Sequence, residues 1–104
     1  MSAGAPRVDF NRINRAALAA LPALLTRWLP DGRQVVAGEW VSRNPRRADR
    51  TPGSFKINMR TGRWSDFAAG DKGGDVVSLA AYLAALSQAD AARALARALG
   101  IETT

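Results

Sequence analysis

The stretch that most constrains the fold runs from residue 51 to residue 75 and reads TPGSFKINMRTGRWSDFAAGDKGGD. Residues 54–57 alternate between polar and apolar side chains, as a strand with one buried face does. Residues 58–62 have the length of a hairpin loop and end in Gly62, which can adopt a positive φ angle. Residues 63–67 return as a second strand. The sequence therefore predicts a β-hairpin at the centre of the fold.

A glycine-rich turn, GDKGGD, follows over residues 70–75. Asp75 precedes an apolar run at the position of a helix N-cap. The turn lacks the GxxxxGK[ST] pattern, which excludes an ATP-binding phosphate loop. The amides of Gly73 and Gly74 can bind one backbone phosphate, but the Asp75 carboxylate competes for those amides, so a plain capped turn is the alternative.

Helices are expected on both sides of the hairpin. Apolar residues recur at helical spacing over residues 9–20, and a second short helix is predicted over residues 22–29. Their apolar stripe packs into a core or, alternatively, docks another domain of a longer protein. Two further helices are predicted over residues 76–86 and 88–99, and Leu86 is expected on the inward stripe of the first of them.

Residues 33–43 are rich in β-forming side chains, and Gly38 marks either a bulge or a break between two strands. The predicted fold class is α+β, with a small antiparallel sheet and hairpin at the core and helices before and after it. Residues 1–8 are expected to be a disordered lead-in. Residues 9–101 are expected to form a single domain, since a chain of 104 residues can bury enough surface to fold without disulfides.

The net charge is +6, and every basic residue except Lys56 and Lys72 is an arginine. Arginine makes bidentate contacts with phosphate and stacks on bases, so this bias suits a nucleic-acid partner. A GC-rich genome produces the same bias, and composition does not decide between the two explanations.

The densest positive charge lies in residues 42–50, SRNPRRADR, which the sequence predicts to be an exposed, turn-rich loop. Such a loop is often only a solvated surface. If the hairpin presents its own cations nearby, the two form a strip that phosphates can follow, with binding that weakens as salt rises. The predicted nucleic-acid-binding residues are Arg43, Arg46, Arg47, Arg50, Lys56, Arg60, Arg63, Trp64 and Lys72.

Trp64 is the predicted stacking platform for a base. Single-strand binding usually combines a basic groove with exposed aromatic rings. Side chains alternate along a strand, so an inward Phe67 would place Trp64 on the outer face. A bulge would reverse this assignment, and aromatic residues in strands are core residues more often than platforms.

The central stretch also resembles a known family. Residues 51–55 (TPGSF), 63–67 (RWSDF) and 72–75 (KGGD) match, in order, segments of the CHC2-type zinc-ribbon domain at the N-terminus of bacterial and phage DNA primases. The resemblance covers roughly residues 35–100, and the nearest kin would be primase-helicase proteins of phages, plasmids and integrated elements. It implies a zinc-ribbon-like fold, a role in template recognition and single-stranded DNA as the partner.

The zinc ligands of that family are missing from this chain. The family's Cys-x-x-Cys pair would fall at Asp66 and Ala69, and the chain contains no cysteine and no histidine. Structural zinc needs thiolate or imidazole ligands, so we expect neither a metal nor another cofactor. Hydrophobic packing by Trp40, Trp64 and Phe67 is expected to fill the space of the metal.

Two function classes remain. The first is a non-catalytic nucleic-acid-binding domain that resembles the template-recognition domain of a mobile-element primase. The alternative is a protein-interaction domain that docks a polymerase or helicase partner and has lost DNA binding with the zinc site. An enzyme is not expected, because histidine and cysteine are absent and the carboxylates are scattered. Convergence of the loop and hairpin cations on one face would favour the first class.

The sequence also predicts a cytoplasmic location. No apolar run approaches the ~20 residues of a membrane span, and the N-terminus lacks the apolar segment of a signal peptide. The absence of cysteine fits a reducing compartment. The chain stops directly after a helix end, and we expect the natural protein to continue into catalytic domains.

Overall fold

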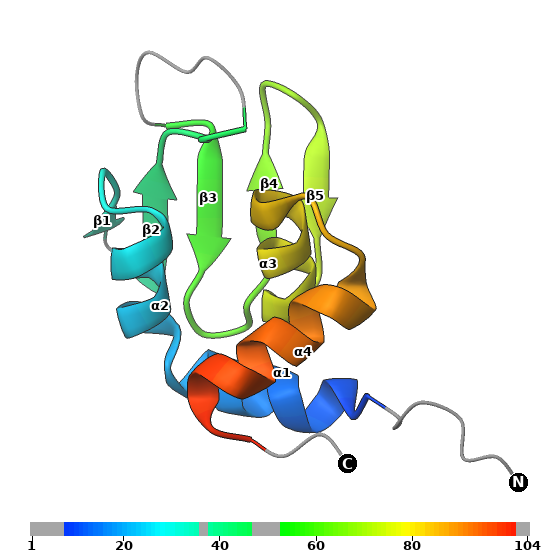
Figure 1. Cartoon of the computed structure of the whole chain (residues 1–104). Coiled ribbons are helices and arrows are strands. Elements are labelled where there is room, and N and C mark those ends of the chain that lie inside the picture. The colour runs from blue at the N-terminus through cyan, green and yellow to red at the C-terminus, as the bar shows by residue number, and fades with distance from the viewer. Residues whose placement is uncertain (1–7, 36–37, 47–52, 102–104) are drawn as a thin grey trace, which may run out of the picture.

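The computed structural model describes residues 8–35, 38–46 and 53–101. Within these ranges the fold is α+β, as predicted, with helices before and after a five-stranded antiparallel sheet. The elements in chain order are α1 (Phe10–Ala19), α2 (Leu21–Trp28), β1 (Arg33–Val35), β2 (Glu39–Ser42), β3 (Phe55–Asn58), β4 (Trp64–Asp66), β5 (Asp71–Gly73), α3 (Val76–Ala84) and α4 (Gln88–Leu99). Figure 1 shows α2 and α3 in front of the sheet, with α1 and α4 below them near the lower ends of the strands.

The strands follow one another in the order β1-β2-β3-β4-β5, so each strand pairs with its neighbours in the sequence. The predicted hairpin is present as β3 and β4, and Gly62 closes it with a φ of +83°. Gly38 lies between β1 and β2, which makes it a break rather than a bulge. The glycine-rich turn differs from the prediction, because residues 71–73 pair with β4 as a fifth strand.

Glycine at position 73 allows β4 and β5 to pair closely over a tryptophan. Gly73 lies directly opposite Trp64 in the register of these strands. A Cβ atom at position 73 would collide with the Trp64 indole and with the Ser78 hydroxyl. The glycine-rich sequence therefore forms the turn and also leaves space for the Trp64 indole to pack under the sheet.

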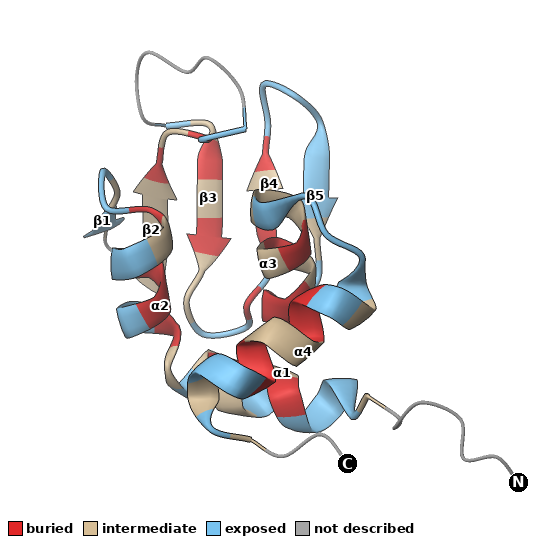
Figure 2. Ribbon diagram, in the orientation of Figure 1, coloured by how far each residue is buried: buried red, intermediate tan, exposed pale blue. Residues whose placement is uncertain are grey.

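The core lies between the sheet and the helix layer (Figure 2). Phe55 and Ile57 of β3 are fully buried, and the apolar stripes of the helices cover them. The apolar stripe of α1 and α2 packs into this core, which is one of the two roles that the sequence predicts for it. The helix residues of this core cluster are Ile13, Ala17, Leu21, Leu24, Leu25, Val76, Val77, Leu79, Ala92, Leu95 and Ala96.

Side-chain caps define the helix starts that the sequence predicts. The Asp75 carboxylate accepts a hydrogen bond of 2.8 Å from the Ser78 amide, which completes a capping box at α3. Ser87 accepts a bond of 3.1 Å from the Asp90 amide at the start of α4. Helix α3 ends at Ala84, two residues before its predicted end, because Ala85 takes the left-handed conformation with a φ of +55°.

Among the described residues, none of the helices combines the length and the apolar character that a membrane crossing requires.

Candidate nucleic-acid interface

The face of β3, β4 and β5 that is turned away from the helices carries three cations. Phe55 and Ile57 point into the core, so the residue between them, Lys56, points to the opposite face. Lys56 pairs with Ser65 on β4, and Ser65 pairs with Lys72 on β5. Since neighbouring strands lie about 5 Å apart, the backbones of Lys56 and Lys72 are about 10 Å apart. Both ammonium groups can therefore contact phosphates of the same strand.

These cations border an open hollow of about 680 Å³ on the outer face. Arg63 precedes β4 and contributes a third cation to its lining. The only acidic side chain in the lining is Glu39 of β2. The hollow is therefore net positive, and the other lining residues are Asn58, Trp64, Ser65, Phe67, Gly73 and Gly74.

Phe67 is the exposed aromatic ring of this face. Its side chain is 74% exposed, more than any other large hydrophobic residue among those described. The Lys56 ammonium lies 5.7 Å from the centre of the ring, within the range of a cation–π contact. An exposed ring beside three cations is the arrangement on which proteins stack unpaired bases.

The predicted orientation of Trp64 and Phe67 is wrong. Trp64 is only 6% exposed and its indole N–H donates to the Ser78 hydroxyl at 3.0 Å. Its ring packs on Tyr82 with centroids 4.7 Å apart. The register explains the reversal, because Trp64 lies opposite the inward Ile57 and Phe67 falls on the outer face. Trp64 is thus a core residue, and Phe67 is the side chain that our sequence reasoning missed as a platform.

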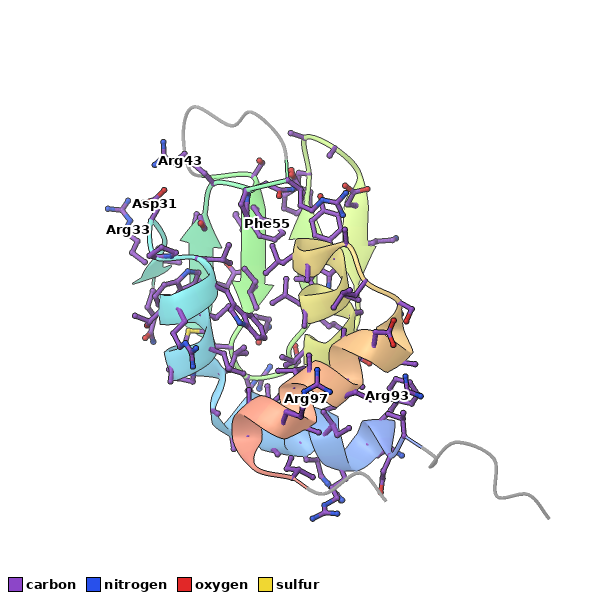
Figure 3. All side chains as sticks on the ribbon, in the orientation of Figure 1. Asp31, Arg33, Arg43, Phe55, Arg93 and Arg97 are labelled. Atoms are coloured by element: carbon purple, nitrogen blue, oxygen red, sulfur yellow. The ribbon has the colours of Figure 1, made fainter. Side chains whose placement is uncertain are left out.

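Two of the predicted loop arginines are engaged within the protein. Arg43 forms an ion pair of 2.7 Å with Asp31, and Figure 3 shows the two side chains beside β1 and β2. Arg46 donates to the Tyr82 carbonyl oxygen at 2.8 Å, and its guanidinium lies 5.2 Å from the centre of the Tyr82 ring. Neither residue lines the outer hollow.

The remaining predicted cations divide into two groups. Arg47 and Arg50 lie outside the described residues. Arg60 is exposed in the turn between β3 and β4 but does not line the hollow. The structure therefore brings together Lys56, Arg63 and Lys72, and it places Arg43 and Arg46 elsewhere. The predicted convergence is thus seen for these three cations, not for Arg43, Arg46 or Arg60.

A buried hydrogen-bond network surrounds Asp66, one of the two positions at which the resemblance to zinc-ribbon domains would place a ligand. Asp66 is fully buried, and its carboxylate accepts a bond of 2.8 Å from the Asn44 side chain. The same Asn44 amide group donates to the Tyr82 hydroxyl, which in turn donates to Asp71 at 2.7 Å. Asn44, predicted to lie in an exposed loop, is 1% exposed. The network links the segment after β2 to β4, β5 and α3 through polar contacts.

This network corrects the predicted packing at the same place. Trp64 packs in the core, but Phe67 does not, since its ring is on the outer face. Trp40 is half-buried, and its indole N–H is buried without a hydrogen-bond partner among the described residues. Hydrogen bonds between buried polar side chains therefore stabilise this region, where we had predicted hydrophobic contacts.

The surroundings of Tyr82 change its acidity. Burial raises the pKa of Tyr82 above its ordinary value of 10.0, because a phenolate is poorly solvated there. The hydrogen bond from Asn44 opposes this shift in pKa, and the carboxylates of Asp71 and Asp66 add to it. Tyr82 therefore stays protonated and keeps its hydrogen bond to Asp71 at neutral pH.

No protein-family model, curated protein or solved structure matches this chain. The resemblance to primase zinc-ribbon domains therefore stays a prediction. Within the described ranges, no three or more acidic, histidine or cysteine side chains gather into a group that could hold a metal ion.

Proposed function

We propose that this chain is a non-catalytic nucleic-acid-binding domain and that the outer face of β3, β4 and β5 is its interface. The observation that carries the proposal is the exposed Phe67 ring beside the Lys56 ammonium, with Arg63 and Lys72 lining the same hollow. The three cations bind phosphates, and the ring stacks on a base. Phosphate contacts supply affinity without sequence preference, and stacking tolerates every base.

Single-stranded DNA is the proposed ligand. A base can stack on a protein side chain only after it has left the duplex stack, so an exposed ring favours an unpaired strand. In line with the resemblance, we place the domain in template recognition by a cytoplasmic primase of a mobile element. Further domains of a longer chain, or a replication partner, would then supply the catalysis.

The test is a titration of a fluorescently labelled single strand of about 12 nucleotides, within the range that small binding domains cover. Fluorescence anisotropy is measured at several salt concentrations, beside a duplex of the same sequence. Three phosphate contacts predict a slope of log affinity against log salt of about −2. We expect tighter binding of the single strand than of the duplex. Absence of saturable binding at low salt would sink the proposal and favour the protein-interaction alternative.

The aromatic contribution is tested by Phe67→Ala. Loss of one stacked base should weaken single-strand binding by about 5- to 100-fold, as alanine substitutions of stacking residues do. The matched control is Phe10→Ala, since Phe10 is 39% exposed but belongs to α1 on the helix side. Equal affinities of both variants and the unmodified chain would show that Phe67 is not a platform.

A further inference from the structure

An apolar groove lies on the helix side of the molecule, in the layer opposite to the sheet face described above. Helices α2, α3 and α4 form its walls, and its volume is about 430 Å³. Leu24 and Trp28 line it from α2, Leu83 from α3 and Leu95 from α4. Leu86, predicted to point inward, is 43% exposed at its border, because α3 ends before reaching it.

Small side chains make the groove accessible to another backbone. Ala80 and Ala84 line it from α3, and Ala94 and Ala98 line it from α4. Alanine projects little beyond the helix surface, so a partner helix can approach closely while the leucines contact its apolar stripe. Figure 1 shows α2 on one side and α3 with α4 on the other, and the groove is lined by residues of these three helices. Insertion of an amphipathic helix into such a groove is a common mode of recognition.

The charge of the groove walls indicates which kind of partner can bind there. Arg27 of α2 lines the groove directly. Arg97 lies on α4, three residues after the groove-lining Ala94, and Figure 3 shows it on the exposed side of that helix. Helices α2 and α3 contain no acidic residue, and the one acidic residue of α4, Asp90, is already paired with Arg93 at 3.1 Å. The walls thus carry unneutralised positive charge.

We propose that this groove docks an acidic amphipathic helix of a partner protein. Leucine-type residues of that helix fill the groove, and its carboxylates face Arg27 and Arg97. A second copy of this chain fits less well, since its own α4 would bring the positive charge of Arg97 against Arg27 and offers no unpaired carboxylate. Helix α4, with 12 residues, is about 18 Å long, so a partner helix of three to four turns matches the groove wall.

The probe is a fluorescein-labelled helical peptide of about 16 residues, with leucines at helical spacing and glutamates elsewhere. A second peptide carries lysines in place of the glutamates, and a third has the same composition with the leucines scrambled. Anisotropy of each peptide is measured with the whole chain. We expect the glutamate peptide to bind about tenfold more tightly than the lysine peptide and the scrambled peptide not to saturate. Equal binding of the three peptides overturns the proposal.

Charge reversal tests the assignment of residues. Arg27→Glu should abolish the preference for the glutamate peptide, and Arg63→Glu, the matched control on the outer sheet face, should leave it unchanged. Leu86→Asp should weaken binding of the glutamate peptide about tenfold, and since Leu86 is 43% exposed the fold should tolerate it. An unchanged preference in Arg27→Glu contradicts the proposal. So does a dimer in light scattering that Leu86→Asp dissociates, because a second copy would then fill the groove.

Discussion

The arginine-rich segment that follows β2 and the outer face of the sheet both carry positive charge, but the structure uses them differently. Arg43 and Arg46, the described arginines of the segment, pair with Asp31 and with the carbonyl and ring of Tyr82. Lys56, Arg63 and Lys72 instead surround an open hollow. In the part of this segment that the structure describes, dense charge in the sequence therefore does not mark side chains that are free to bind a ligand. The strand register decides which cations line the hollow.

The largest expected effect comes from charge reversal on the sheet. Lys56→Glu with Lys72→Glu should lower the affinity for single-stranded DNA by at least about 100-fold at low salt, because two attractive phosphate contacts become repulsive. The matched control is Arg27→Glu with Arg97→Glu, which changes the net charge equally on the helix side. Fluorescence anisotropy measures both. Similar losses in the two double variants would show that net charge, and not the sheet face, holds the strand.

The next largest effect is expected on the stability of the fold, from the buried side chain of Asn44. Asn44→Ala should destabilise the fold by about 2–3 kcal/mol, because the substitution leaves buried partners such as the Asp66 carboxylate without its amide. Urea unfolding measures the change, and Asn11→Ala, an exposed substitution on α1, should stay within about 0.5 kcal/mol. Affinity for DNA should be unchanged in both variants. A loss of affinity in Asn44→Ala beyond its unfolded fraction would make the segment part of the interface.

Tyr82 offers a pH-dependent measure of the same anchor. It is the only tyrosine of the chain, so tyrosinate absorbance reports it alone. The absorbance midpoint of the folded protein should lie above the ordinary pKa of 10.0, since burial raises the pKa of Tyr82. The folded state then holds the proton at a pH where the unfolded state loses it. Its contribution to stability is full below about pH 10 and falls as pH rises through the folded value.

Tyr82→Phe isolates this contribution. The variant should lose about 1 kcal/mol at neutral pH, because the hydroxyl hydrogen bonds to Asn44 and Asp71 are absent. Above pH 10, the free energy of unfolding of the variant should also fall less steeply, because the variant has no Tyr82 hydroxyl to ionise. Urea unfolding at pH 7 and above pH 10 measures both. Parallel stability curves for the two proteins over this pH range would contradict the predicted shift in pKa.

The smallest effect is expected from the loop arginines themselves. Arg43→Gln with Arg46→Gln should change DNA affinity by less than about twofold, because both side chains already have partners within the protein. The comparison variant is Arg63→Gln, whose cation lines the hollow and whose loss should weaken binding several-fold more. Anisotropy at one low salt concentration is sufficient. A larger loss of DNA affinity in the double variant than in Arg63→Gln would show that the loop arginines, and not the outer sheet face, contribute more to binding.

Local signals predicted much of the fold. Helical spacing located the helices, Asp75 marked the start of one of them, and Gly62 marked the hairpin turn. The exception is the strand at residues 71–73, whose glycines disfavour a strand in isolation. That strand forms because Gly73 gives the Trp64 indole room and β4 offers a pairing edge.

The candidate site was less predictable, because it depends on distant partners. Asn44 bonds to Asp66, 22 residues away, and to Tyr82, 38 residues away, and no local pattern encodes either choice. The orientation of Trp64 depends on one step of register. One signal was available: Ile57 was predicted to be inward, and a tight hairpin places Trp64 opposite it. Applied to both strands, that pairing would have identified Phe67 as the exposed ring.

The central claim is that single-stranded DNA binds the outer sheet face, and amide chemical-shift mapping tests it most directly. The ¹⁵N-labelled chain is titrated with the unlabelled single strand, and each backbone amide is followed by NMR. The account predicts that the largest shift changes fall on Lys56, Ser65, Phe67 and Lys72. Largest changes at Arg43 and Arg46, or along α2 and α4, with the sheet amides unchanged, would contradict it.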